Sequence, residues 1–241
     1  MGRKRRLRRL DALLAEAHPR LDHPERLIAE HAVLVDGRIV TNPASRVPID
    51  ASILIRARRP LRGEVKLRDA IEALGVMVEG SVAIDVGAAA GGFTHALLER
   101  GARRVYAVDA GYGQLVGSLR RHPRVVNLER TNLGDLNPTL VPEPVHLVTM
   151  DLSYLALSQA VPQLAKIWLT PRTRLLALVR PQFELGLARS PTDRESLEEA
   201  LERATAGIVR AGWEICGTRE SPVRGARGST EFFVYAIRRV G

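Results

Sequence analysis

Charged side chains stand at or near the ends of several apolar runs in this sequence of 241 residues. These side chains belong to Asp85, Asp109, Asp151 and Arg180. If the runs are parallel strands of one sheet, their carboxyl ends meet at one edge, where α/β proteins bind ligands. Asp109 has the position of the acid that binds ribose hydroxyls in nucleotide-binding folds. We therefore expect a nucleoside-like ligand at this edge.

A glycine-rich turn follows the first of these strands, within the stretch 81–94, SVAIDVGAAAGGFT. Glycine at Gly87, Gly91 and Gly92 permits unusual backbone dihedrals and leaves room for a ligand, and Phe93 begins a helical pattern whose amides face the turn. The spacing GAAAGG differs from the dinucleotide G-x-G-x-x-G, so an ordinary strand-turn-helix remains an alternative. Two nearby acids favour a positively charged adenosyl ligand over a pyrophosphate.

The order of the remaining elements predicts the fold class. Strands are expected at 82–86, 105–108, 125–128, 147–150, 175–179, 213–218 and 231–237, and helices at 66–74, from Phe93 onward and at 193–210. Strands that alternate with helices indicate an α/β, doubly wound sheet that is parallel through most of its width.

Composition restricts the class of protein. The length allows one large and one small domain, and 45% hydrophobic residues suffice for a core. Cys216 is the single cysteine, so we expect no internal disulfide and a cytoplasmic location. The histidines show no ligand spacing, and we expect no metal site. The sequence has no apolar run long enough to cross a bilayer and no secretory apolar core after its basic start.

Positive charge is concentrated at the N-terminus. Residues 1–62 contain 14 Lys or Arg and 7 Asp or Glu, which accounts for most of the formal net charge of +9. A basic module beside a nearly neutral one points to a nucleic acid, because neutralising phosphates supplies much of the binding free energy. A solvated basic face, or a general arginine bias, is the alternative explanation.

The basic region has the pattern of a small α+β module. Helices are expected at 9–14 (RLDALL) and 24–28 (PERLI), and Asp36-Gly37 favours a tight hairpin turn. These motifs and VLVDGRIVTNPASRV resemble the S-four-type RNA-binding fold. The resemblance predicts an RNA-binding domain at 1–59, a linker at 60–65 and a second domain at 66–241. Its candidate phosphate contacts are Arg3, Lys4, Arg5, Arg6, Arg9 and Arg26, each of which could equally be an exposed arginine or lysine without a role.

A resemblance to a known family covers nearly the whole chain. It rests on residues 63–67, DVGAAAGGFT, VYAVDAGYGQL, LERTN, Asp151-Leu152-Ser153, VRPQFE and EFFVY, in that order. Together they are similar to the TlyA family, whose members have an S-four-type domain and an FtsJ/RrmJ-type methyltransferase domain and were historically labelled haemolysins. The resemblance implies a Rossmann-like, S-adenosyl-L-methionine-dependent enzyme. Its substrate would be a ribose 2′-hydroxyl of ribosomal RNA, most often of cytidine, in free RNA or a ribosomal subunit.

Residue roles follow from the same resemblance. The implied cofactor-binding residues are Asp85, Gly87, Ala88, Gly91, Gly92, Phe93, Asp109 and Asn132. Asp85 would lie near the methionine portion, Asp109 would bind the ribose, and Asn132 would lie near the adenine. The family's catalytic group is Lys, Asp, Lys, Glu, and the matching positions here are Lys66, Asp151, Arg180 and Glu231.

Arg180 departs from that group, since the family usually has lysine there. Arginine supplies a positive charge but stays protonated and cannot accept a proton. Lys66, Asp151 or water could take the proton instead; the enzyme could be slow or altered in substrate; or the chain could be an RNA- or ribosome-binding pseudo-methyltransferase. The segments RGEVKL and GLARSPTDRES also differ from the family pattern, which leaves another RNA, or a small-molecule hydroxyl, open as substrate. A membrane-damaging haemolysin has no support in the sequence.

Overall fold

A computed structural model describes the chain apart from residues 1–5, 20, 22, 30–31, 57–58 and 240–241. The chain separates into two compact units, residues 1–59 and 60–241, which are described in turn. Three of the candidate RNA contacts, Arg3, Lys4 and Arg5, lie outside the described residues, and so does the side chain of Arg26.

The smaller unit packs two short helices against short strands. Its elements are β1 (Leu7–Arg9), α1 (Leu10–Ala17), α2 (Pro24–Ala29), β2 (Val33–Val35), β3 (Arg38–Ile39), β4 (Arg46–Pro48) and β5 (Ile53–Ile55). The strands form a β3-β2-β5 sheet and a β1-β4 pair. Asp36 and Gly37 join β2 to β3 with φ angles of 48° and 78°, which confirms the predicted hairpin turn. Leu10, Leu14 and Ile28 form the centre of its core.

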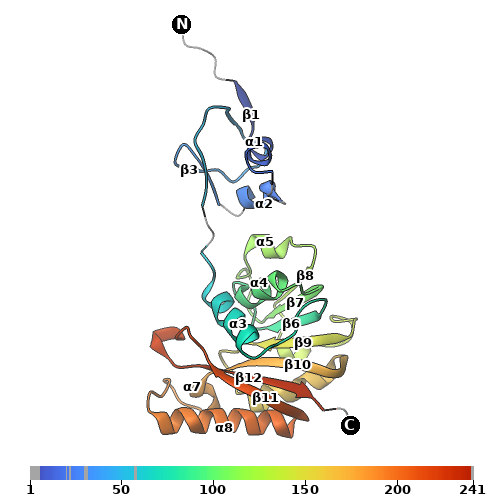
Figure 1. Cartoon of the computed structure of the whole chain (residues 1–241). Coiled ribbons are helices and arrows are strands. Elements are labelled where there is room, and N and C mark those ends of the chain that lie inside the picture. The colour runs from blue at the N-terminus through green and yellow to red at the C-terminus, as the bar shows by residue number, and fades with distance from the viewer. Residues whose placement is uncertain (1–5, 20, 22, 30–31, 57–58, 240–241) are drawn as a thin grey trace. The chain divides into compact units, whose positions relative to one another are not determined.

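The larger unit has the predicted alternation of helices and strands (Figure 1). Its elements, with η for a 3₁₀ helix, are α3 (Arg62–Ala73), β6 (Val82–Val86), α4 (Gly92–Glu99), β7 (Arg104–Asp109), α5 (Gly117–Arg120), β8 (Val125–Glu129), η1 (Leu133–Asp135), β9 (Val145–Met150), α6 (Leu157–Ala160), η2 (Val161–Lys166), β10 (Leu169–Val179), α7 (Pro181–Glu184), α8 (Arg194–Arg210), β11 (Trp213–Glu220), η3 (Ala226–Gly228) and β12 (Phe232–Arg238). The predicted strands are confirmed, several of them with longer bounds.

These strands form one sheet in the order β11-β12-β10-β9-β6-β7-β8. The pairs from β10 to β8 are all parallel, whereas β12 runs antiparallel to both of its neighbours, β10 and β11. This arrangement confirms the α/β class with a mostly parallel sheet. Because β12 is reversed, its first residues lie at the edge where the parallel strands end.

Helices cover both faces of the sheet. On one face α3, α4 and α5 bury a cluster that includes Leu67, Leu97 and Leu119, and on the other α6, η2 and α8 bury a cluster that includes Leu157 and Ile208. Strand β6 is buried along its full length, as expected for a strand covered on both sides.

The expected linker at 60–65 requires a correction, because α3 begins at Arg62 and includes residues 62–65. Pro60 and Gly63 are residue types that often interrupt regular structure, but Pro60 precedes the helix and Gly63 lies in its first turn. Gly63 has a packing reason to be small, since a Cβ there would press on the Phe93 ring at 3.3 Å.

Candidate active site

The glycine-rich turn between β6 and α4 is shaped by close contacts within the protein. Gly87 and Gly91 have φ angles of 85° and 92°, a left-handed conformation that favours glycine. A Cβ on Gly87 would lie less than 3.0 Å from the Asp151 carbonyl oxygen, and one on Gly91 would overlap the Leu119 side chain. The expected unusual dihedrals are thus present at Gly87 and Gly91, and the space that we expected for a ligand is also required by neighbouring protein atoms.

Gly92 brings α4 against the start of α3. A Cβ there would lie 2.9 Å from the Glu64 backbone nitrogen and 3.0 Å from Gly63 Cα. Lys66 lies one helical turn after Arg62 on α3, so this backbone contact fixes the distance between the glycine-rich turn and Lys66. Gly87 does the same for Asp151, whose backbone N–H donates to the Val86 carbonyl at 2.9 Å.

Asp85 is completely buried beneath the turn. Its carboxylate accepts hydrogen bonds from the hydroxyls of Thr94, at 2.6 Å, and Thr149, at 3.1 Å. Burial raises the pKa of Asp85 to about 6, and the hydrogen bonds oppose that rise. Asp85 thus joins β6 to α4 and β9, a role that sequence reasoning missed because the two threonines lie far apart in the chain.

Asp109, at the end of β7, lies between two backbone loops. Its two carboxylate oxygens accept hydrogen bonds from the Ala89 and Gly111 N–H groups, each at 2.7 Å. A carboxylate has about four lone-pair sites, so each oxygen keeps capacity for a further donor such as a ribose hydroxyl. Nearby, the guanidinium of Arg130 stacks on the exposed Tyr112 ring at 3.9 Å from its centroid.

Asn132 lies beyond the end of β8, at the start of η1, and is exposed. Its side-chain amide donates to the Asp135 carboxylate at 3.1 Å. Ala88 and Phe93 are buried around the glycine-rich turn. Apart from Asn132, the implied cofactor residues are confined to β6, the turn after it, the start of α4 and the end of β7.

Lys66, Asp151, Arg180 and Glu231 come together at the carboxyl edge of the sheet. Lys66 Nζ donates to Glu231 Oε2 at 2.5 Å, and Arg180 Nε donates to Asp151 Oδ1 at 2.7 Å. Arg180 Nη1 lies 3.9 Å from Glu231 Oε1, which joins the two ion pairs into one row. These four residues come from α3 and from the segments after β9, after β10 and before β12.

The two ion pairs differ in exposure. The Lys66 and Glu231 side chains are 7% and 0% exposed, whereas those of Arg180 and Asp151 are both 18% exposed. Both Nε and Nη2 of Arg180 contact Asp151 Oδ1. Among the described residues, Asp151 Oδ2 therefore has no hydrogen-bond donor, although it belongs to the more accessible pair.

A possible metal-binding group lies between α3, which contributes Glu64, and α4, which contributes His95 and Glu99. Glu64, His95 and Glu99 each offer a ligand atom, and these atoms lie within 4.8 Å of one another. Arg68 donates to Glu64 Oε1 at 2.7 Å and to Glu99 Oε2 at 2.6 Å. A guanidinium thus already supplies the positive charge between the two carboxylates.

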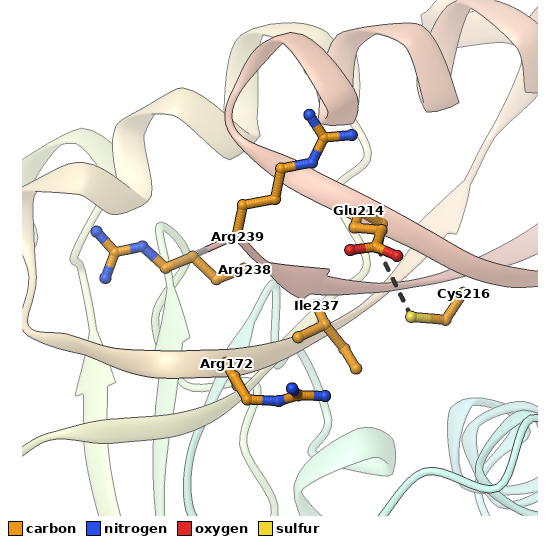
Figure 2. Close-up of a pocket in the computed structure, with 6 residues that line it drawn as sticks. All are labelled: Arg172, Glu214, Cys216, Ile237, Arg238 and Arg239. Atoms are coloured by element: carbon orange, nitrogen blue, oxygen red, sulfur yellow. Dashed lines mark hydrogen bonds between the residues drawn. The ribbon is translucent and has the colours of Figure 1, made fainter. Parts of the chain in front are cut away.

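A basic hollow of about 370 Å³ lies at the other end of β12 from Glu231 (Figure 2). Its lining residues are Arg172, Glu214, Cys216, Ile237, Arg238 and Arg239. Since β12 spans seven residues, this hollow is about 20 Å from the four-residue group.

In the smaller unit, Arg6 and Arg9 are exposed. Arg9 binds Asp11 with two hydrogen bonds, at 3.0 and 2.6 Å, so its guanidinium is partly neutralised by a neighbour.

No helix within the described parts of the chain is long and apolar enough to cross a membrane.

The strand order, the reversed β12 and the acids at the strand ends define the class of α/β methyltransferases. A structure described as an S-adenosylmethionine-dependent methyltransferase from Listeria monocytogenes shares this fold, with a TM-score of 0.55, 15% identity and coverage of 76% of this chain and 100% of that one. Residues 60–238 match the model of the FtsJ-like methyltransferase family.

The 16S/23S rRNA (cytidine-2′-O)-methyltransferase TlyA of Mycobacterium tuberculosis is 36% identical over 218 residues, which cover 87% of this chain and 81% of that protein. A structure described as a hemolysin from Streptococcus thermophilus is 29% identical, with a TM-score of 0.71 over 97% of this chain and 89% of that one. The chain therefore belongs to the TlyA family of FtsJ-like methyltransferases.

Proposed function

We propose that this protein transfers a methyl group from S-adenosyl-L-methionine to a ribose 2′-hydroxyl of ribosomal RNA, with cytidine as the target nucleotide, in the cytoplasm. The observation that carries the proposal is the assembly of Lys66, Asp151, Arg180 and Glu231 at one edge of a methyltransferase sheet. The relative from Mycobacterium tuberculosis, named for this reaction, supports the choice of substrate.

The residues around the glycine-rich turn suit this cofactor. Asp109 retains acceptor capacity for ribose hydroxyls, and the segment around Asn132 would flank the adenine. Asp85 would act through the turn that it anchors, because its own oxygens are buried and bonded to Thr94 and Thr149. A bound pyrophosphate would favour lysine or arginine nearby, and the turn itself, residues 87–92, contains neither.

The proposed chemistry is an in-line displacement at a sulfonium-bound methyl group. When bound, S-adenosyl-L-methionine would supply its methyl group to the 2′-oxygen, and the electron pair of the broken carbon–sulfur bond would stay on sulfur. The hydroxyl proton passes to Asp151 Oδ2, which has no donor among the described residues and belongs to the more exposed pair. Arg180 and Lys66 supply positive charge near the developing alkoxide.

Arg180 can fill this role without acting as a base. Its guanidinium remains protonated and holds Asp151 through two nitrogen atoms on one oxygen. Lys66 donates a hydrogen bond to the fully buried carboxylate of Glu231, which fixes its Nζ in place. Assignment of the proton to Asp151 therefore removes the need for a deprotonated lysine at position 180.

A hollow of about 460 Å³ among α6, α7 and α8 would hold an unstacked nucleotide. It is lined in part by Tyr154, Gln182 and Phe183, from the segments that follow Asp151 and Arg180. Tyr154 is 56% exposed, and single-stranded nucleotides commonly stack on such aromatic rings. We expect Tyr154→Ala to raise KM for RNA more than it lowers kcat.

The smaller unit would dock on structured RNA as an S-four-type domain. Arg6 and Arg9 are exposed on its surface, although Arg9 is bound to Asp11, and Arg3, Lys4, Arg5 and Arg26 complete the proposed set of phosphate contacts. Removal of residues 1–59 would then weaken RNA binding and flatten its salt dependence, because fewer phosphates are neutralised. A small-molecule methyltransferase would keep its activity after this deletion.

The decisive experiment is to map 2′-O-methylation on ribosomal RNA and on isolated subunits after incubation with the protein and S-adenosylmethionine. A single new methylated cytidine, absent with Asp151→Asn, supports the proposal. Binding of cofactor and RNA without any new methyl group in either substrate overturns it. A pseudo-methyltransferase would be supported further if Arg180→Lys created activity where the natural chain has none.

A further inference from the structure

The segment between β11 and β12, residues 221–230, folds over the Glu231 side chain. Its ends are joined by the Ser221 N–H, which donates to the Glu231 carbonyl at 2.9 Å, and its tip by the Gly225 N–H, which donates to the Ser229 carbonyl at 2.7 Å. Gly225 is buried within it. The segment is thus a closed turn whose inner wall is the backbone at Gly225.

That wall touches the Glu231 carboxylate directly. A Cβ on Gly225 would lie less than 3.0 Å from Glu231 Oε1, from Glu231 Cδ and from Ser229 Oγ, closer than real Cβ atoms approach. Glu231 Oε1 is buried and accepts no hydrogen bond from any residue that the structure describes, while Oε2 accepts one from Lys66. The ion pair between Oε1 and Arg180 Nη1 is long, at 3.9 Å, so packing against Gly225 contributes to holding the carboxylate in the orientation that serves Lys66 and Arg180.

Arg62 fixes the wall from behind. Its Nη2 donates to the carbonyls of Arg224, at 2.5 Å, and Gly225, at 3.1 Å. Arg62 is the first residue of α3, and Lys66 lies four residues later on the same helix. One turn of α3 therefore contains both Arg62, which binds the backbone at Gly225, and Lys66, which binds Glu231.

We propose that Gly225, held by Arg62, is a positioning residue for Glu231. It sets the Glu231 carboxylate against Lys66 and Arg180, so the spacing of the four-residue group depends on the lack of a side chain at position 225. The inference rests on the proposed function for its consequence in catalysis. The placement of Glu231 itself does not depend on that function and can be measured separately.

The first test compares Gly225→Ala with Gly228→Asn in the full-length protein. Both lie in the same turn, but Gly228 has φ of 82° with nothing within 4 Å of its Cβ position, and asparagine tolerates that conformation. We expect Gly225→Ala to lower kcat about 100-fold, as a displacement of about 1 Å in an active site does, and Gly228→Asn to stay near the natural chain. The Kd for S-adenosylmethionine, by calorimetry, should be unchanged in both.

A double variant separates positioning from general damage to the turn. Glu231→Asp shortens the carboxylate by one methylene and makes room for the alanine methyl group. Glu231→Asp alone should reduce activity, and adding Gly225→Ala to it should cost little more. If the fold-losses of activity in the two single variants multiply in the double variant, the proposal is overturned. It is also overturned if Gly225→Ala is as active as the natural chain.

A readout without catalysis uses the three lysines of the sequence, Lys4, Lys66 and Lys166. Lys66 is buried against Glu231, whereas Lys166 is exposed and serves as an internal reference. Mass spectrometry after brief acetylation should show Lys66 protected in the natural chain and several-fold more reactive in Gly225→Ala. Arg62→Gln, which loosens the wall without adding an atom at position 225, should show a smaller increase.

Equal protection of Lys66 in all three proteins would overturn the positioning role even if the enzyme is active. Conversely, if the natural chain methylates no ribosomal RNA, a rise in Lys66 reactivity in Gly225→Ala alone still supports the placement of Glu231. Failure of the proposed function and failure of this inference therefore give different results.

Discussion

The two ion pairs of the active site show how one group of four charges can serve two purposes. Lys66 and Glu231 are almost fully buried, whereas Arg180 and Asp151 are partly open to solvent. A buried pair is held by its surroundings and is costly to break, while a partly exposed pair can exchange contacts with a substrate. In the proposed function, Lys66 and Glu231 would form the fixed support, and Arg180 and Asp151 would face the RNA.

The same difference explains how arginine can stand at position 180. In the exposed pair, the guanidinium holds one oxygen of Asp151 and leaves the other available. A residue that only fixes and balances charge does not have to lose a proton. If this interpretation is right, changes at the two pairs will affect catalysis and folding to different degrees.

The largest expected effect is the loss of activity in Asp151→Asn. The change removes the proposed proton acceptor and weakens the hold of Arg180, so kcat should fall about 10³-fold, within the usual range for general bases. Calorimetry should show natural affinity for S-adenosylmethionine. Glu72→Gln, which alters an exposed carboxylate on α3, is the matched control and should leave kcat unchanged. An active Asp151→Asn protein would contradict the assignment of the base.

Glu231→Gln should have the largest effect on folding. It leaves the Lys66 ammonium buried without its carboxylate partner, which typically costs about 3–5 kcal/mol of unfolding free energy. Urea denaturation of Glu231→Gln and Asp151→Asn gives the comparison directly. The Asp151 change should cost clearly less, because its pair is more exposed. Equal losses would mean that the two pairs do not differ as their burial suggests.

Arg180→Lys should change activity only modestly. Lysine keeps the positive charge but has a single ammonium in place of the several N–H donors of the guanidinium. Its ion pair with Asp151 should therefore be weaker. We expect kcat within about tenfold of that of the natural chain. Transfer of a labelled methyl group, or mapping of the methylated nucleotide by reverse transcription, would measure it. Arg180→Gln, which has no charge, should be much less active. A large gain in Arg180→Lys would indicate that the natural enzyme lacks a base.

The smallest expected effect concerns the anchor of the glycine-rich turn. Burial raises the pKa of Asp85 from 3.8 to about 6, so between these values the folded state binds more protons than the unfolded state. Stability conferred by the protonated form is therefore lost as the pH rises through this window. Asp85→Asn should flatten the dependence of the unfolding free energy on pH between about 4 and 6. An unchanged slope would show that Asp85 does not titrate there.

Much of the sheet could be predicted from local patterns. The apolar run before Asp85 and the run after Arg104 each form a buried strand, and the Asp36-Gly37 turn forms a hairpin. These features depend on residues close together in sequence, where periodicity and turn chemistry are informative. The start of α3 was missed because Gly63 has the pattern of a break, whereas its contact with Phe93 becomes visible only in three dimensions.

The group of four charges could be proposed from a family resemblance, but its pairing could not. Lys66 and Glu231 lie 165 residues apart, and the sequence around neither residue predicts that the two form an ion pair. The role of Gly225 was equally hidden, although its place six residues before Glu231 in a turn with Gly228 was a signal of close packing. Four positions around the site have no room for a side chain, because protein atoms lie too close to the Cβ position: Gly87, Gly91, Gly92 and Gly225.

The position of β12 has a consequence for how the protein matures. This strand follows every other strand in the chain, yet it lies between β10 and β11 in the sheet. Until it emerges during synthesis, β10 has an unpaired edge and β11 has no neighbour, an arrangement that invites chaperones or aggregation. The residue before β12 is Glu231, so the sheet and the proposed catalytic group would be completed together, late in synthesis. A nascent chain could form its cofactor turn early, but it could not become an enzyme before its last strand is in place.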